Sequence, residues 1–174
     1  MKQIIITLLF IFSAYFFISI NVKENVKIPA NAIRIRILAN SNDEYDQKIK
    51  KEVKEDVQDY MSKLLFDIKT YEEAESKITN NLDAIEKEVG NTLRMFNYTL
   101  PYKINFGLNY FPEKEYKGIK YESGYYESLL ITLGKGEGDN WWCVLFPPLC
   151  LIEAEESTEI EYTSIVKEIL DKYV

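Results

Sequence analysis

The sequence predicts an α+β fold, a two-layer sandwich in which helices cover one face of a mostly antiparallel sheet. Residues 33–37 and 102–110 alternate between apolar and polar side chains, which is the period of a strand with one buried face. Residues 49–64 and 74–96 place apolar side chains at every third or fourth position, which is the period of an amphipathic helix. These patterns give the order β-α-α-β-β-β-α and hence two layers around one core.

The chain of 174 residues suits one domain, which we place at residues 33–174 after a polar linker at residues 21–32. Residues 1–20 form a separate segment, in which Lys2 precedes an apolar run over residues 4–20. This pattern is typical of a signal peptide or of an uncleaved N-terminal membrane anchor. As a helix the run would span roughly 25 Å, slightly less than a bilayer core.

The sequence leaves the site of signal cleavage open. Directly after the apolar run, Phe17 and Ser19 form a poor small-x-small pair. Ala30 and Ala32 fit better, but they lie next to the first predicted strand. The sequence therefore predicts export and allows both an anchored form and a released form.

The first helix follows the strand at residues 33–39 and is expected to begin in a capping box formed by Ser41 and Glu44. Thr70 is expected to cap a second helix that continues to about residue 96, antiparallel to the first. Three further strands are predicted from the apolar patterns, and a short helix ends the chain. These elements cover residues 102–110, 126–133, 141–146 and 160–170.

The composition excludes several classes of function. The net charge of −7 and the excess of acidic over basic residues, 28 to 21, argue against a nucleic-acid partner. The chain contains no histidine, which removes histidine-based nucleophile activation and zinc ligation. The acids Asp43, Glu44, Glu137 and Asp139 lie at a helix start and in a glycine turn, where ordinary roles explain them. We therefore expect neither an enzyme nor a metal or cofactor site.

Cys143 and Cys150 are the only cysteines. Fully extended, the chain between them would span roughly 23 Å, so a disulfide requires a reversal, which Pro147 and Pro148 make plausible. An exported compartment favours oxidation. The alternative is that both side chains are buried free thiols, because cysteine packs well as a small apolar residue.

A glycine-rich segment is the candidate partner-binding surface. The strand that follows it argues against a phosphate-binding loop, which a helix would follow. The simplest interpretation is a mobile hairpin loop between the last two strands. Trp141 and Trp142 should point to opposite faces, so that one is free to contact a protein or a sugar ring, although both could pack in the core. The candidate residues are Gly134, Gly136, Gly138, Asp139, Asn140, Trp141 and Trp142.

Two blocks of the sequence resemble the stage II sporulation protein R family. The longer block runs over 124–150 and contains the glycine-rich segment, both tryptophans, Pro147-Pro148 and both cysteines. The shorter block contains Arg34-x-Arg36-Ile37-Leu38-Ala39-Asn40-Ser41-Asn42, followed by Asp46-Gln47. The resemblance spans about residues 32–152. The chain departs from the family pattern at Glu122-Ser123, at Leu130 and at Lys54; an arginine is usual at the last two positions.

The resemblance implies a protein that is made in the forespore and exported into the space between the two membranes. There it would be required for a membrane-embedded aspartic protease of the mother cell to process the precursor of sporulation sigma factor E. Two alternatives remain, an intermembrane-space hydrolase and a peptidoglycan-binding module. The first lacks a paired-acid motif, and the second would use a tryptophan to stack on sugars.

Overall fold

The computed structural model describes residues 26, 28, 29, 31–116, 119–151 and 159–173. The expected signal or anchor segment, residues 1–20, lies outside this described part. Within the described residues, no helix combines the length and the apolar character that crossing a membrane requires.

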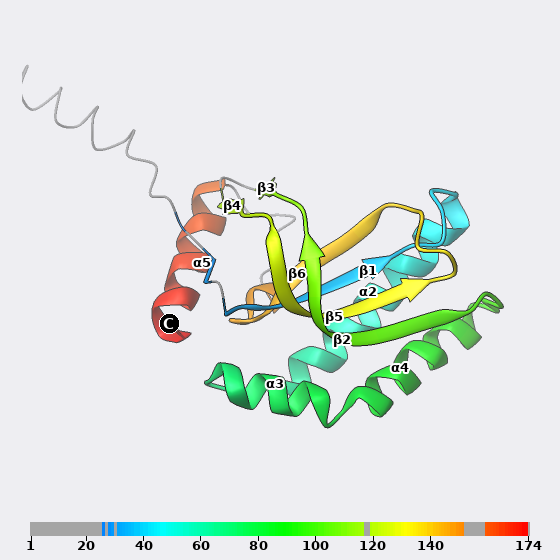
Figure 1. The fold of residues 1–174 in the computed structure, drawn as a ribbon, viewed down its shortest axis with the longest axis horizontal. Helices are drawn as coiled ribbons and strands as arrows, with labels where there is room; N and C mark the ends of the chain where they lie inside the picture. The colour runs from blue at the N-terminus through cyan, green and yellow to red at the C-terminus, as the bar shows by residue number, and fades with distance from the viewer. Residues whose placement is uncertain (1–25, 27, 30, 117–118, 152–158, 174) are drawn as a thin grey trace, which may run out of the picture.

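The centre of the fold is a mixed four-stranded sheet with the order β2-β5-β1-β6 (Figure 1). These strands are β1 (Ile33–Leu38), β2 (Tyr102–Phe111), β5 (Gly124–Leu133) and β6 (Asn140–Phe146). β1 is parallel to β5 and antiparallel to β6, while β2 and β5 are antiparallel. The prediction of a mostly antiparallel sheet therefore holds for two of the three pairings, and the parallel pair makes the sheet mixed.

Three helices cover one face of the sheet (Figure 1). They are α2 (Glu44–Leu64), α3 (Tyr71–Thr79) and α4 (Leu82–Met95). The apolar stripes predicted for them are buried, for example Val53 of α2 and Val89 of α4. They pack on the inward side chains of β1 and β5, namely Ile33, Ile35, Ile37, Leu129, Ile131 and Leu133.

The single helix predicted over residues 70–96 is wrong in one respect, because it divides into α3 and α4. Asn80 is the C-cap of α3 and Asn81 is the N-cap of α4. The Asn81 side chain donates to the Lys77 carbonyl at 2.8 Å, a local bond of the kind by which asparagine competes with helix continuation. The predicted cap at Thr70 is confirmed, and with Glu73 it forms a complete capping box.

The last helix corrects the prediction that all helices lie on one face. α5 (Glu159–Tyr173) packs at one end of the opposite face, beside a small hairpin of β3 (Lys114–Tyr116) and β4 (Ile119–Tyr121). Its apolar side chains, Tyr162, Val166 and Leu170, contact a second core cluster that contains Ile119, Tyr121 and Val144. Val26, Ile28 and the buried Ala32 also belong to this cluster, so part of the expected linker contacts the domain.

Candidate functional site

The glycine-rich connection between β5 and β6 lies at one end of the sheet. Because β1 lies between β5 and β6, residues 134–139 do not form the predicted hairpin turn but cross over the end of β1. The chain leaves β1 at this same end and turns into α2. The crossing connection therefore meets the β1–α2 loop, residues 39–43, directly (Figure 1).

Four hydrogen bonds join the two loops, which we call the loop clamp (residues 39–43 and 134–139). The Glu137 and Gly138 amides donate to the carbonyls of Asn40 and Ala39 at 3.2 and 3.0 Å. The Lys135 amide donates to Asn40 Oδ1 at 3.0 Å. The Asp139 amide donates to Asn42 Oδ1 at 2.6 Å. The segment interpreted from sequence as a mobile loop is thus held along its length.

Two glycines permit this close approach. A Cβ atom at Gly134 would lie 2.2 Å from Asn40 Oδ1, and the Gly134 φ of 56° is itself a glycine conformation. A Cβ atom at Gly138 would lie 2.2 Å from the Ser41 carbonyl oxygen. Glycine is therefore required here by contact with a segment almost a hundred residues earlier in the chain.

Asp46 fixes the base of the loop clamp. It lies in the first turn of α2, is 7% exposed, and accepts from Asn40 Nδ2 at 2.7 Å and from Ser41 Oγ at 2.6 Å. The predicted capping box of Ser41 and Glu44 is wrong. The N-cap of α2 is Asp43, without a side-chain cap bond, because Ser41 Oγ is used for Asp46 and accepts from the Asp43 amide at 3.1 Å.

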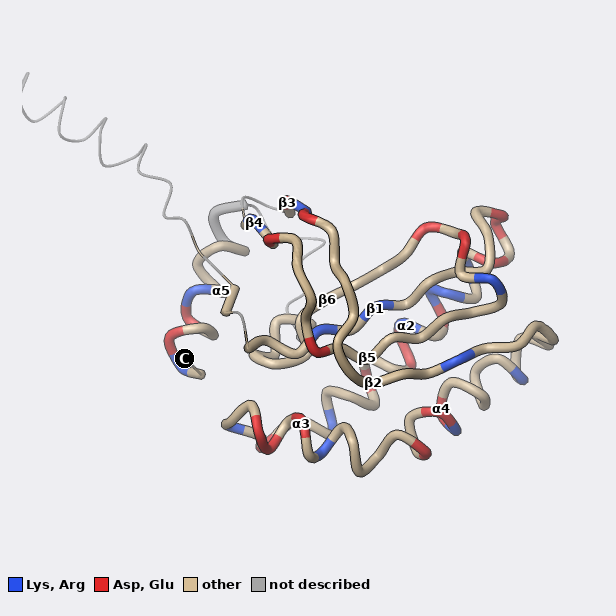
Figure 2. Tube along the Cα trace, viewed as in Figure 1, with Lys and Arg blue, Asp and Glu red and all other residues tan. Residues whose placement is uncertain are grey.

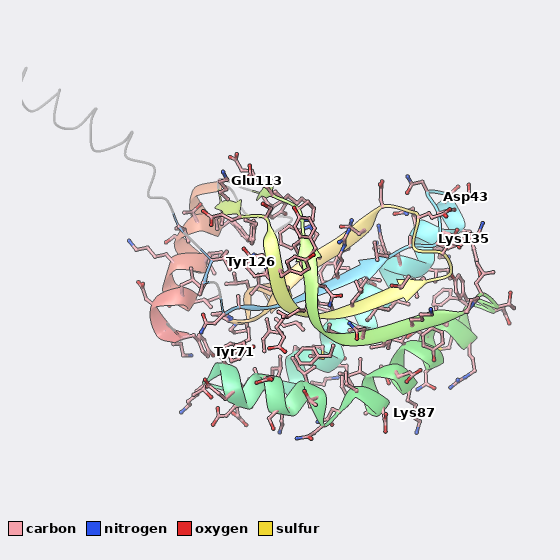
Figure 3. The ribbon with its side chains drawn as sticks, in the orientation of Figure 1. Asp43, Tyr71, Lys87, Glu113, Tyr126 and Lys135 are labelled. Carbon is pink, nitrogen blue, oxygen red and sulfur yellow. A yellow bond between two sulfur atoms is a disulfide. The ribbon has the colours of Figure 1, made fainter. Side chains whose placement is uncertain are left out.

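The outer surface of the loop clamp carries both charge signs. The side chains of Lys135, Glu137 and Asp139 are exposed, as are those of Asn42 and Asp43. Figure 3 shows Asp43 and Lys135 at the same end of the molecule. Of the candidate partner-binding residues, Asp139 is the exposed one, whereas the other six are partly buried.

Lys50 of α2 ties the helix to this loop. Its ammonium donates to the Asp139 carbonyl at 3.1 Å and to Gln47 Oε1 at 2.5 Å. Desolvation lowers the pKa of the Lys50 ammonium, and the Asp139 carboxylate offsets this in part. Lys50 thus ties the first two turns of α2 to the loop clamp.

The two tryptophans point to opposite faces of β6, as predicted, and each is half-buried. Trp141 packs on the helix-covered core, and Lys54 Nζ lies 5.6 Å from the centre of its ring. Trp142 packs on the second cluster, edge-on to Tyr121 with ring centres 5.0 Å apart. Neither indole is therefore a fully free surface anchor.

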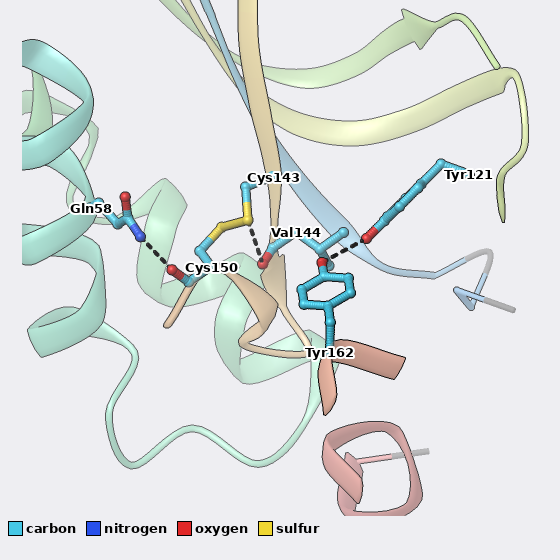
Figure 4. The surroundings of a disulfide bond; sticks show 6 residues. All are labelled: Gln58, Tyr121, Cys143, Val144, Cys150 and Tyr162. Carbon is cyan, nitrogen blue, oxygen red and sulfur yellow. Dashed lines mark hydrogen bonds between the residues drawn. A yellow bond between two sulfur atoms is a disulfide. The ribbon is translucent and has the colours of Figure 1, made fainter. Parts of the chain in front are cut away.

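A disulfide joins Cys143 of β6 to Cys150 of η1 (Leu149–Leu151), which confirms the predicted bridge (Figure 4). The two Cα atoms lie 5.6 Å apart, as the reversal at Pro147 and Pro148 allows. Gln58 of α2 donates its side-chain amide to the Cys150 carbonyl. The disulfide therefore fastens η1 to the middle of β6, and the Gln58 bond ties η1 to α2.

An arginine site that the sequence pattern does not predict lies on the face of the sheet opposite α2–α4. The alternation in β1 implied that Arg34 and Arg36 face solvent, but Arg34 is only 1% exposed. The Arg34 guanidinium lies 3.4 Å above the centre of the Tyr126 ring, 5.2 Å from the Phe111 ring and 5.4 Å from the Trp142 ring. Desolvation lowers the Arg34 pKa, and the hydroxyls of Tyr126 and Tyr121 offset this in part.

The hydrogen-bonding capacity of these arginines is only partly used. Arg34 Nε and Nη1 and Arg36 Nε are buried without a hydrogen-bond partner in the described part of the chain. An isolated buried charge costs several kcal/mol, of which a desolvated cation–π contact offsets about 2 kcal/mol. Arg36 is less enclosed, and its Nη1 donates to the Tyr110 carbonyl at a long 3.4 Å. The sequence signal that could have revealed this site is the group of aromatic residues at 110–126, which cover the arginines of β1 in the fold.

Two other kinds of site, a metal site and a ligand cavity, were sought in the described residues. No group of three or more His, Cys, Asp or Glu side chains there is placed to hold a metal ion. A cavity of about 470 Å³ lies between the end of α2 and the end of α5, where Met61, Leu65 and Tyr173 line it. It lies at the opposite end of α2 from the loop clamp.

Comparison with known proteins gives one consistent result. The family model described as stage II sporulation protein R matches residues 29–156. The chain is 40% identical over 130 residues to the stage II sporulation protein R of Bacillus subtilis (strain 168), which covers 75% of this chain and 58% of that relative. The chain thus matches less than two thirds of the relative's length. No solved structure matches.

Proposed function

The chain belongs to the stage II sporulation protein R family, and from this premise we propose that it is an exported signalling protein of endospore formation. In this proposal it activates a membrane-embedded aspartic protease of the mother cell and thereby triggers processing of the precursor of sigma factor E. Activation would occur through binding that shifts the protease toward its active state, which requires only that the protein bind that state more tightly. No catalysis by this chain is involved.

The loop clamp is the observation that carries the proposal. The two blocks on which the family resemblance rests are far apart in the sequence, yet Asn40 and Asn42 of one bond the amides of Lys135 and Asp139 of the other. They form one fixed surface on which exposed charged side chains project. A preorganised surface loses little conformational entropy on binding, which suits a signalling ligand.

The proposed location rests on two features. The apolar run over residues 4–20 after Lys2 supports export from the forespore to the intermembrane space. There the protein would be either released or anchored by that run. The disulfide between Cys143 and Cys150 fits such a compartment, because exported spaces are oxidising and the cytosol keeps thiols reduced.

Reconstitution tests the proposal directly. The full-length chain would be incubated with liposomes that contain the protease, together with the sigma-factor precursor, and cleavage would be followed on gels. We expect the chain to stimulate cleavage, and Glu137→Ala and Asp139→Ala to weaken this stimulation. Glu72→Ala on α3 removes the same exposed charge far from the loop clamp and serves as the matched control.

Two results would contradict the proposal at different levels. Absence of stimulation by the wild-type chain would reject protease activation. Normal stimulation by folded Glu137→Ala, Asp139→Ala and Asn140→Ala variants would reject the glycine-rich loop as the contact surface.

A further inference from the structure

On the face of the sheet opposite α2–α4, the described strand residues carry positive charge and no acidic side chain. The strand registers place Asn105, Leu130, Arg36 and Trp142 in one row across this face, with Lys103 in the next row. Among the described strand positions that share the face, Arg34, Arg36 and Lys103 are cationic and none is Asp or Glu. Figure 2 shows basic residues alone on β1, whereas α3 carries both signs. This distribution is unexpected in a chain with a net charge of −7.

Among the described residues, acids on neighbouring elements do not neutralise Arg34 and Arg36. Glu127 of β5 points to the other face, where it accepts from the Tyr71 hydroxyl. Glu113, at the entrance to the small hairpin, pairs with Lys120 at 3.0 Å. The buried guanidinium nitrogens of Arg34 and Arg36 thus lack an anion within the described part of the chain.

Arg36 is the accessible member of the pair. It is partly exposed, whereas Arg34, two residues earlier on the same face of β1, is buried among Phe111, Tyr126 and Trp142. The 3.4 Å bond from Arg36 Nη1 to the Tyr110 carbonyl is long, so a charged acceptor would replace it with a stronger bond. An anion that reaches Arg36 would also be attracted by the charge of Arg34.

We propose that Arg36, supported by Arg34, binds a carboxylate of a partner polypeptide that lies across this open face. A guanidinium offers two parallel N–H donors to a carboxylate, and the flanking Leu130 and Trp142 suit an apolar part of the same peptide. The inference deepens the proposed function by naming the chemistry of the partner, and it rests on that function only for the identity of the partner. Arg34 acts here as a positioning residue.

Side-chain NMR on the ¹⁵N-labelled full-length chain in detergent micelles tests the inference without the protease. The first probe is an acetylated, amidated tripeptide with Glu between two Leu residues. The matched probes carry Gln in place of Glu, one amidated and one with a free C-terminal carboxylate, and inorganic phosphate is the fourth. We expect saturable shifts of the Arg36 Nε–H and Trp142 Nε1–H signals with the Glu peptide and none with the amidated Gln peptide.

Variants locate the response. Arg36→Gln should abolish the shift of the Trp142 signal, whereas Lys103→Gln, which removes one charge from the same face, should retain it. Response to the free-carboxylate Gln peptide alone would assign the site to a chain terminus, which still supports a polypeptide carboxylate. Equal shifts with both amidated peptides, shifts with phosphate alone, or an unchanged response in Arg36→Gln would overturn the inference.

The cleavage assay separates this inference from the proposed function. If the wild-type chain binds the Glu peptide but does not stimulate cleavage, the carboxylate site stands and the proposed function fails. If stimulation occurs but no carboxylate binds, the proposed function stands and the site fails. If stimulation of cleavage is lost in Arg36→Gln and retained in Lys103→Gln, the carboxylate site takes part in activation of the protease.

Discussion

Replacement of Gly138 by alanine tests the loop clamp most directly. The added Cβ would lie 2.2 Å from the Ser41 carbonyl oxygen, so the two loops must separate by about 0.8 Å to reach even the 3.0 Å limit of real contacts. Such a shift weakens the bonds that the amides of Glu137, Gly138 and Asp139 donate across the clamp. At about 0.5–1.5 kcal/mol for each bond, we expect a loss of roughly 2–4 kcal/mol in the free energy of unfolding.

Urea denaturation of the full-length chain in mild detergent, followed by tryptophan fluorescence, measures this loss. Gly107→Ala serves for comparison, because a Cβ there meets nothing within 4 Å and the φ of 155° strains alanine, so that its effect measures backbone strain without a clash. Without a clash, alanine at Gly138 would stabilise the chain by about 0.4–1 kcal/mol through the unfolded state. The sign of the change in unfolding free energy therefore shows whether Gly138→Ala creates a clash. A Gly138→Ala variant that is as stable as wild type would refute the tight contact of the two loops.

Three further predictions concern other parts of the fold. Reduction of the disulfide between Cys143 and Cys150 should lower the unfolding free energy by about 2.5 kcal/mol, and the unreduced protein should be lighter by two hydrogens in an intact-mass measurement. As a single substitution, Gly90→Ala should not stabilise the protein, because the added Cβ would lie 2.7 Å from the Tyr102 hydroxyl. In the Tyr102→Phe variant, which lacks this hydroxyl, the same substitution should raise the unfolding free energy by about 1 kcal/mol in urea melts. Burial raises the pKa of the Tyr121 hydroxyl. The stability that this buried neutral hydroxyl contributes is therefore fully present below about pH 10, where tyrosine in the unfolded chain begins to ionise, and it falls above that pH. Tyr121→Phe should show a smaller fall in unfolding free energy when urea titrations are repeated at alkaline pH.

The sequence predicted the elements of this fold better than their arrangement. Strands 33–38 and 102–111 and the buried stripes of α2 and α4 follow from local periodicity, which a single sequence carries. The position of β1 between β5 and β6 depends on pairing between distant segments, and nothing local records it. For the same reason the local pattern predicts a hairpin turn at residues 134–139, where the chain instead crosses over the end of β1.

Arg34 illustrates a second limit of sequence reasoning. The alternation of isoleucine and arginine in β1 predicts a strand with one buried and one solvated face, because burial of an unpaired charge is costly. Here Tyr126 of β5 and Phe111 of β2 cover the arginine from strands about ninety and eighty residues later. Only the three-dimensional register reveals that these aromatic rings lie over a cation and that no carboxylate of the described residues pairs with it.

The loop clamp changes what the glycine-rich segment can be expected to do. Gly134 and Gly138 are required because Asn40 and Ser41 lie against them. The two glycines are therefore explained by the fold, without contact to a partner. Recognition must then come from side chains that the clamp holds outward, such as Glu137 and Asp139, or from another surface altogether. The face with Arg36 is such a surface, and its charge is opposite to that of the chain as a whole. A loss of signalling in a glycine variant is therefore evidence about folding, whereas a loss in Glu137→Ala or Arg36→Gln is evidence about contact.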